Sequence, residues 1–232
     1  MDLNRRTCLG GLAAAAITGI GFADAGQPGK SELRSDPGRK LEPARILLPK
    51  PQTTIGRPLM QVLQDRRSIR DFKPDRLPRQ MLSNLLWAAF GINRPDGRRT
   101  APSARNWQEI EIFLATADGL FVFDAKAHVL DCVMTDDLRG LTGTQSFTTE
   151  APLNLVYVAD LSKAGDDPGE QDTFVPVDSA FIAQNVYLFC ASEGLATVFR
   201  GSVDRARLTK AMRLPEKHKV LFAQTVGYER LT

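Results

Sequence analysis

The segment Val177–Glu193 constrains the fold more than any other part of the sequence, because it is the most apolar predicted helix in the chain. Apolar side chains lie on most of its faces, among them Phe181, Ile182, Val186, Tyr187, Leu188 and Phe189. A helix that is apolar nearly all round has to be buried in a core or between subunits. Gly194 follows directly and is a typical end for a helix. We therefore expect a chain built around this one helix.

The size and charge of the chain limit what it can do. Its 232 residues, 43% of them apolar and 25% charged, have the balance of a globular protein and the length of one domain. The net charge of +3 is too small to draw the chain toward nucleic acid or anionic lipid. We expect neither nucleic-acid binding nor insertion into a membrane.

The N-terminus has the parts of a twin-arginine signal peptide, predicted over residues 1–25. The pair Arg5-Arg6 precedes a weakly apolar stretch at 9–22, and Ala23-Asp24-Ala25 fits a signal-peptidase site. The apolar stretch is too short to span a bilayer as a stable helix. The sequence thus predicts export to the periplasm, by a route that carries chains already folded around their cofactor. Because NAD(P)H is not available there, we expect another electron donor, a quinol or a periplasmic carrier.

Three cysteines are present, and Cys8 lies within the predicted signal peptide. Cys132 and Cys190 remain in the mature chain, with no C-x-x-C motif and no zinc-like spacing. Two buried thiols are favoured over a disulfide between them, and both interpretations stay open.

The mature chain divides into an arm and a domain. Residues 26–58 are rich in Gly, Pro, Lys and Arg, which predicts a linker followed by an extended arm. Residues 59–232 are expected to form the domain. Its hydrophobic patterns predict helices at 59–66, 78–90, 137–149, 177–193 and 204–212, and strands at 109–115, 120–125, 129–134, 153–159, 197–199 and 220–227. Hairpins mixed with helices in this order indicate an α+β sandwich rather than a doubly wound fold.

The sequence contains no complete acid–base or nucleophilic set. Its two histidines, His128 and His218, have no Asp, Glu or Cys at ligand spacing, so we expect no metal site and no Ser-His-Asp arrangement. The acidic segment 166–170 lacks the alternating oxygen ligands of a calcium loop and is predicted to be a solvated turn. The G-x-S-x-G motif of many hydrolases is also missing. Either the chain is not an enzyme, or a bound cofactor performs the chemistry.

One dense group of residues suits a phosphate-bearing ligand. The segment Asp65–Phe72 contains Arg66, Arg67, Ser68 and Arg70, three guanidiniums and a hydroxyl at the end of a short predicted helix. Arginine binds phosphate through a planar fork, and serine adds a neutral donor. Taken alone, a charge run of this kind is more often a solvated face.

Several other motifs accompany this group in a fixed order. They are Leu85-Leu86-Trp87-Ala88-Ala89-x-Gly91, Ala101-Pro102-Ser103-Ala104-x-Asn106-x-Gln108, Ala151-Pro152, Asp178, Asn185 and Gly194-Leu195. In order and spacing the set resembles the nitroreductase family, with a nearer likeness to its SagB/ThcOx-type dehydrogenase branch. The likeness covers about residues 46–228.

The resemblance implies a three-layer sandwich, with a mixed, mostly antiparallel sheet flanked by helices, in an intertwined homodimer that binds FMN without a covalent bond. Arg66 and Ser68 would hold the phosphate and ribityl chain, with Arg67 alongside. Arg70 would approach the N1/O2 edge of the flavin ring, where reduction places negative charge. No side chain is expected to be the catalytic group, because the chemistry occurs at flavin N5. Further cofactor contacts are implied for Pro102, Ser103, Ala104 and Asn106 of the partner subunit, for the Gly201-Ser202 turn facing N5, and for Gln145 at the polar edge of the ring.

The sequence departs from the family pattern in places. A basic pair that many relatives carry beyond the last strand is missing, and Arg230 is the candidate to replace it. Glu109 stands where a proline is frequent and would alter the pocket wall. A basic loop contains Arg94, Arg98, Arg99 and Arg105, for which a solvated face is favoured over a role in binding an anionic substrate or the phosphate.

Three functions are considered as hypotheses. The first is an exported FMN-dependent oxidoreductase that transfers two electrons to an unidentified small-molecule acceptor. The second is a SagB-like FMN dehydrogenase that oxidises a peptide or small molecule. The third is a non-catalytic protein that binds flavin or another partner.

Overall fold

The computed structural model describes residues 45–230 of the chain. The predicted signal peptide at 1–25 and the first part of the predicted arm lie outside the described residues. The predicted domain at 59–232 lies within them, apart from its last two residues.

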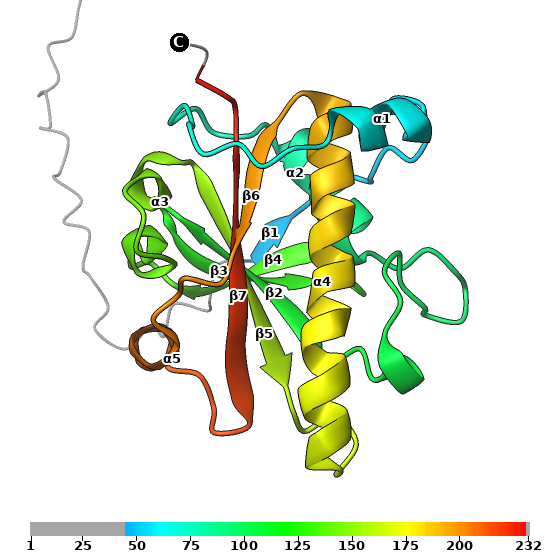
Figure 1. The fold of residues 1–232 in the computed structure, drawn as a ribbon, viewed down its shortest axis with the longest axis vertical. Helices are drawn as coiled ribbons and strands as arrows, with labels where there is room; N and C mark the ends of the chain where they lie inside the picture. Colours follow the sequence, from blue (N-terminus) through cyan, green and yellow to red (C-terminus); the bar gives the residue numbers. More distant parts are fainter. Residues whose placement is uncertain (1–44, 231–232) are drawn as a thin grey trace, which may run out of the picture. The chain divides into compact units, whose positions relative to one another are not determined.

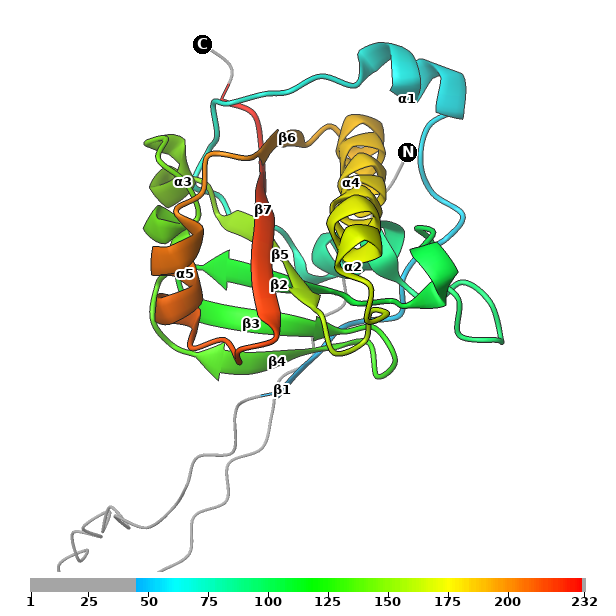
Figure 2. The same cartoon turned by 60° about the horizontal axis from the view of Figure 1, so that its bottom comes forward.

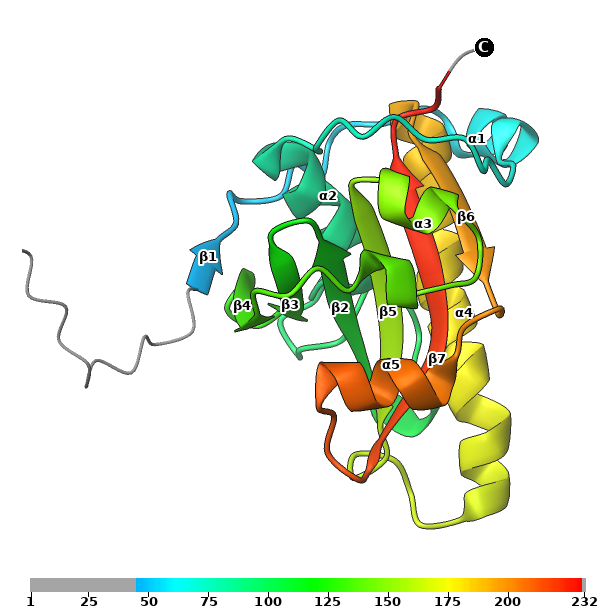
Figure 3. The same ribbon diagram turned by 90° about the vertical axis from the view of Figure 1, so that its left-hand side faces the viewer.

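A seven-stranded sheet organises the domain, with the strand order β1-β4-β3-β2-β5-β7-β6. Each neighbouring pair in this order runs antiparallel, so the mostly antiparallel sheet expected from the sequence is confirmed. Figure 3 shows the sheet from β1 and β4 at one side to β6 and β7 at the other. The strands are β1 (Arg45–Leu47), β2 (Ile110–Thr116), β3 (Gly119–Asp124), β4 (Val129–Met134), β5 (Leu153–Asp160), β6 (Ala196–Arg200) and β7 (His218–Gly227).

Helices cover both faces of this sheet and complete a three-layer sandwich. The helices α2 (Arg79–Phe90) and α4 (Pro168–Glu193) lie on one face, while α3 (Phe147–Glu150) and α5 (Arg205–Met212) lie on the other (Figures 1 and 2). Central strand β5 is buried along its whole length, and its side chains alternate between two cores. Leu155 and Tyr157 join the core under α2 and α4, whereas Val156 and Val158 join the core under α5.

The helix α4 begins at Pro168 rather than at Val177, where the apolar pattern starts. The side chain of Asp167 accepts a hydrogen bond from the N–H of Gly169 (2.8 Å), and Pro168 occupies the first turn. An aspartate cap followed by proline is a typical helix start. Of the solvated turn predicted at 166–170, residues 168–170 belong to the helix instead, whereas 166–169 are exposed as expected. Gly194 ends the helix in the left-handed conformation (φ 70°), as expected.

The burial expected for α4 is found on one side of the helix, while Val177 and Phe181 stay exposed. One side of the helix is buried against the sheet and α2, through Val175, Ile182, Val186 and Cys190 among others. By length and mean hydropathy (1.3) alone, α4 could also cross a membrane. In the structure it lies along the sheet, as the core helix of a domain does.

The predicted helix at 137–149 is largely absent. Only a short 3-10 turn at Arg139–Leu141 and the single turn α3 form there. Gly140 and Gly143 interrupt the segment, and glycine weakens a helix through its backbone freedom. A Cβ on Gly143 would overlap Nη1 of Arg200, so any larger residue would displace the Arg200 guanidinium from its place against this loop.

The described part of the predicted arm lies on the domain. Its strand β1 pairs with β4, the N–H of Gln52 donates to Asn84 of α2 (2.8 Å), and the N–H of Arg57 donates to Ser192 of α4 (2.9 Å). The arm then continues into α1 (Leu59–Asp65), which lies beside the C-terminal end of α4 (Figure 1). Cys132 and Cys190 are both free thiols, and burial raises the pKa of the Cys190 thiol.

Candidate functional site

The segment Arg66–Arg70 leaves the end of α1 in an extended conformation and is fixed at one end of α4. The backbone N–H of Arg66 closes α1 on the carbonyl of Val62, and ψ then turns to 120°. Further on, the N–H of Ile69 donates to the carbonyl of Thr197 in β6 (3.0 Å). The backbone of the arginine segment is thus held to α1 and to the sheet, while Arg67, Ser68 and Arg70 are exposed.

Two residues of this segment, Arg66 and Ser68, contact the same tyrosine of α4, Tyr187. The guanidinium of Arg66 lies 5.3 Å from the centre of the Tyr187 ring, and Ser68 Oγ lies 2.8 Å from the Tyr187 hydroxyl. That same hydroxyl accepts the N–H of Phe199 in β6 (2.9 Å). Tyr187 therefore connects the arginine segment to the strand that leads to Gly201.

The charges along this segment are only partly neutralised. Arg67 forms a long ion pair with Glu229 (3.5 Å), in which both side chains keep solvent exposure. Arg66 and Arg70 have no carboxylate partner within residues 45–230. A hollow of about 420 Å³ opens beside α1 and the end of α4, lined by Arg57, Arg66, Arg67, Tyr187, Thr197 and Glu229 among others. Arg57 and Arg67 pair there with Asp65 and Glu229, whereas Arg66 keeps no carboxylate partner in the described chain and is suited to binding an anion.

A second group forms the turn after β6. Gln145 donates from Nε2 to Ser202 Oγ (2.6 Å), which brings Gln145 and Ser202 together next to Gly201. The other amide atom, Gln145 Oε1, is buried and has no hydrogen-bond donor in the described chain. Buried acceptors are normally satisfied, so this one is suited to an N–H that the protein does not supply.

The buried guanidinium of Arg200, the last residue before this turn, holds β6 to its neighbours by hydrogen bonds. It donates to the carbonyl of Thr142 (2.8 Å) and to Asn154 Oδ1 (2.9 Å), which joins β6 to the 142–145 loop and to β5. Burial lowers the pKa of Arg200 to about 10. Arg200 was not predicted from the sequence, because its partners lie far away in the chain.

A third group is the loop that carries Pro102, Ser103, Ala104 and Asn106. Arg105, Asn106 and Gln108 have left-handed backbone angles (φ 51°, 58° and 51°), which are uncommon for residues other than glycine. The N–H of Ala104 donates to Asp178 in α4 (2.8 Å). Asp178 and Tyr187 are separated by about 13 Å along the helix axis. Within one chain, this loop and the Arg66–Arg70 segment therefore contact different parts of α4.

The basic loop next to it is partly neutralised. Arg98 pairs with Asp96 (3.3 Å), and Arg105 pairs with Glu170. Arg99 instead lies over the Phe90 ring and donates to Gln108 (2.8 Å), and desolvation lowers its pKa. Together with Arg94, Pro102, Ser103 and Asn106, these arginines line a hollow of about 490 Å³.

The structure places Arg230 away from the Arg66–Arg67 hollow. Its guanidinium bridges Asp71 (3.3 Å) and Glu150 (3.1 Å). Two carboxylates already neutralise this charge, so the geometry does not favour Arg230 as the replacement for the missing basic pair.

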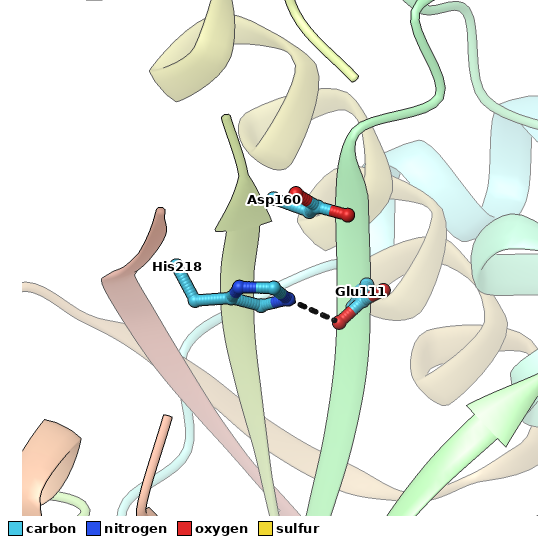
Figure 4. Close-up of side chains that lie close together, drawn as sticks. All are labelled: Glu111, Asp160 and His218. Atoms are coloured by element: carbon cyan, nitrogen blue, oxygen red, sulfur yellow. Dashed lines mark ion pairs between the residues drawn. The ribbon is translucent and has the colours of Figure 1, made fainter. Parts of the chain in front are cut away.

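A cluster outside these groups contains His218, which the spacing in the sequence left without an acidic neighbour. Glu111, Asp160 and His218 come from β2, β5 and β7 and approach one another at one end of the sheet (Figure 4). His218 Nε2 lies 3.5 Å from Glu111 Oε2. The ammonium of Lys163 already contacts Glu111 (2.8 Å) and Asp160 (3.1 Å). A protein cation thus occupies the position in which these carboxylates would hold a metal.

Known structures share this three-layer architecture. The fold is shared with the NADPH:FMN oxidoreductase of Vibrio harveyi solved in complex with NAD⁺, at 22% identity over 75% of this chain and 69% of that chain, with a TM-score of 0.56. The model of the nitroreductase family matches residues 63–228, and the chain belongs to this family. The family expected from the sequence is therefore confirmed, and the chain is a nitroreductase-type oxidoreductase.

Two other relatives share more of the sequence. A nitroreductase-type protein from Ralstonia eutropha JMP134, known from a crystal structure, is 40% identical, with a TM-score of 0.78 over 81% of this chain and 90% of that one. A nitroreductase-type protein of Methanocaldococcus jannaschii is 28% identical over 169 residues, which are 68% of this chain and 85% of that protein.

Proposed function

We propose that this protein is an FMN-dependent oxidoreductase that transfers two electrons to a small-molecule acceptor. The single observation that carries the proposal is the Arg66–Arg70 segment, which is fixed on α4 and β6 while Arg66 and Arg70 keep no carboxylate partner in the described chain. Membership of the nitroreductase family and the fold shared with an NADPH:FMN oxidoreductase support a flavin as the anion-bearing ligand.

The phosphate and ribityl end would be held by Arg66 and Ser68. Both lie on the side of the extended segment that contacts Tyr187, so a ligand there meets a guanidinium fork and a hydroxyl together. Arg67 lines the same hollow as Arg66 but pairs with Glu229, and it would contribute charge rather than a direct contact.

The ring end would lie toward Arg70 and the turn Gly201-Ser202. Gln145 Oε1, a buried acceptor without a donor, fits a ring N–H such as N3–H of a flavin. Bound there, the flavin supplies hydride transfer at N5, which no side chain of this chain can replace. The guanidinium of Arg70 would stabilise the negative charge that reduction places near N1.

A homodimer would bring the Pro102–Asn106 loop of one subunit to the flavin of the other. Exposed apolar side chains on α1 and α4 support this arrangement, with Met60 76% and Phe181 45% exposed. Large exposed apolar side chains that cluster on neighbouring elements favour an interface between proteins. Asn106 would then reach the cofactor site of the partner subunit from a loop that is hydrogen-bonded to α4.

We also propose that the protein acts after export to the periplasm, with a quinol or a periplasmic carrier as electron donor. A SagB-like dehydrogenase is the second candidate, favoured by the spacing of Ala101-Pro102-Ser103-Ala104-x-Asn106 in the sequence. Substrate-dependent hydrogen peroxide without NADPH would support the dehydrogenase, whereas reduction of quinones or nitroaromatics by an added donor would support the reductase.

The test compares three alanine variants of the purified mature protein. R66A is expected to weaken FMN binding by about tenfold or more, because a charge-assisted phosphate contact is lost. R70A is expected to slow reduction of bound FMN by roughly a hundredfold. The control is R76A, since Arg76 is exposed and pairs only with Asp118. Equal FMN affinity and equal reduction rates in all three variants would refute the assigned roles.

A further inference from the structure

Two buried carboxyl groups lie directly beneath the loop that carries Asn106. Glu109 immediately precedes β2 and is 0% exposed, and Asp178 in the middle of α4 is 2% exposed. Their carboxyl groups accept hydrogen bonds from two consecutive residues of that loop, Ser103 and Ala104, which brings the two groups close together. Burying two ionised carboxylates side by side is costly, because each loses its hydration and each repels the other.

The hydrogen bonds around the pair leave one atom without a donor. Ser103 Oγ donates to Glu109 Oε2 (3.3 Å), and Ala104 N–H donates to Asp178 Oδ2 (2.8 Å). Glu109 Oε1 is buried and receives no hydrogen bond within residues 45–230. Two carboxylates cannot donate to each other. A proton on Glu109 turns one of its oxygens into a donor toward Asp178 and satisfies both groups.

No basic side chain compensates the pair. Among the described residues, neither Glu109 nor Asp178 forms an ion pair with a lysine or arginine. Arg105, which lies in the same loop as Asn106, forms its ion pair with Glu170 instead. Asp160, whose N–H donates to the Glu109 carbonyl, directs its own carboxylate to Ser162 and Lys163. Burial, followed by the charge of Asp178, raises the pKa of Glu109 to about 7, and burial also raises the pKa of Asp178.

The loop above depends on these two carboxyl groups. Ser103 Oγ accepts the N–H of Gln108 (2.8 Å) while it donates to Glu109, so Glu109 fixes both ends of the turn. Asp178 fixes its middle through Ala104. The turn contains three residues with left-handed backbone angles, which persist only where the surrounding structure holds them.

We propose that Glu109 and Asp178 share one proton, and that this proton positions the Ser103–Asn106 loop for its contact with the cofactor. The cofactor contact rests on the proposed function, whereas the shared proton rests on the buried pair alone. When the proton leaves, two facing carboxylates repel beneath the loop, and the hydrogen bonds to Ser103 and Ala104 are disturbed. Glu109 and Asp178 are thus positioning residues, and neither takes part in electron transfer.

The first measurement does not require flavin. Infrared difference spectroscopy of the purified protein, titrated across pH 7, is expected to show the C=O band of a protonated, buried carboxyl that disappears as the pH rises. The band should be missing in E109Q, whose amide can donate to Asp178 and imitate the protonated acid. If the wild type lacks such a band at pH 6, or if E109Q retains it, the shared proton is refuted.

The second measurement addresses the loop. FMN affinity of the wild type is expected to fall by about fivefold or more as the pH rises through 7, while E109Q keeps a nearly constant affinity. E109A, which cannot donate to Asp178, is expected to bind weakly at every pH, and E109Q therefore serves as the conservative rescue. If the FMN affinities of wild type and E109Q depend on pH in the same way, the positioning role of Glu109 is refuted. If the wild type binds no FMN at any pH, the proposed function is refuted. The infrared measurement then tests the shared proton on its own.

Discussion

Tyr187 is the residue that joins the two ends of the proposed cofactor site. Its hydroxyl contacts Ser68 of the arginine segment and accepts the Phe199 N–H of β6. The sequence pattern assigned Tyr187 only to the apolar surface of a helix. Its partners could not be predicted, because Ser68 lies 119 positions away and hydrogen bonds over such a separation depend on the assembled fold.

Replacing Tyr187 by phenylalanine tests this connection. Two hydrogen bonds are lost, and the expected cost in unfolding free energy is about 1–2 kcal/mol. FMN affinity should fall as well, since Ser68 loses the partner that orients it. Y228F is the matched control, because the Tyr228 side chain forms no hydrogen bond within the described part of the chain. Chemical denaturation and FMN titration of both variants provide the comparison; equal effects of the two changes would contradict the role of Tyr187.

Glu109 gives a prediction on stability that is independent of the cofactor. Its pKa of about 7 in the folded protein lies above the ordinary value of 4.5. The protonated group therefore contributes stability that is fully present below about pH 4.5 and is lost as the pH rises through 7. Between pH 5 and pH 8, the thermal midpoint of the wild type is expected to fall relative to that of E109Q. A constant difference over this range would mean that Glu109 does not titrate there.

At the scale of elements, local sequence signals decided some boundaries and tertiary contacts decided others. Strand β4 was predicted with its observed bounds, Val129–Met134, because its apolar run ends in clear turns. The segment 137–149 was wrongly predicted as a helix, because Gly140 and Gly143 weaken a helix there and the loop packs against the buried Arg200 guanidinium. The start of α4 was missed although its signal, Asp167-Pro168, is present in the sequence.

The cap of α4 can be tested directly. D167A removes the acceptor for the Gly169 N–H and is expected to lower the unfolding free energy by about 1 kcal/mol. D166A is the control, since it removes a neighbouring carboxylate of the same charge that does not cap the helix. The two variants are compared by denaturant unfolding followed by circular dichroism. A cost for D166A as large as that for D167A would show that charge, rather than capping, determines the effect.

At the scale of the whole molecule, the three-layer sandwich and the family followed from patterns spread over most of the chain, and both are confirmed. The sequence patterns did not predict which residues of the site would contact one another. Arg66 and Ser68 both contact Tyr187 of α4, while Arg230 binds Asp71 and Glu150. Position in the sequence cannot show which carboxylates will neutralise a given arginine.

The proposed homodimer leads to a prediction on the exposed face of α4. F181D places a charge on the apolar surface expected between subunits, and it should convert the dimer to a monomer with little bound FMN. V133D is the control, because Val133 on β4 is similarly exposed (41%) on a different element. Light scattering coupled to size-exclusion chromatography measures the mass of each variant. A wild type that is already monomeric, or an F181D variant that remains dimeric, would contradict this interface.

The identity of the bound chromophore tests the central claim most directly. The mature protein is purified, denatured to release any noncovalent ligand, and the ligand is identified by chromatography and mass spectrometry. We expect a yellow protein that releases FMN, at up to one molecule per subunit. A colourless protein that also takes up no added FMN would contradict the claim that the Arg66–Arg70 segment serves to bind a flavin phosphate.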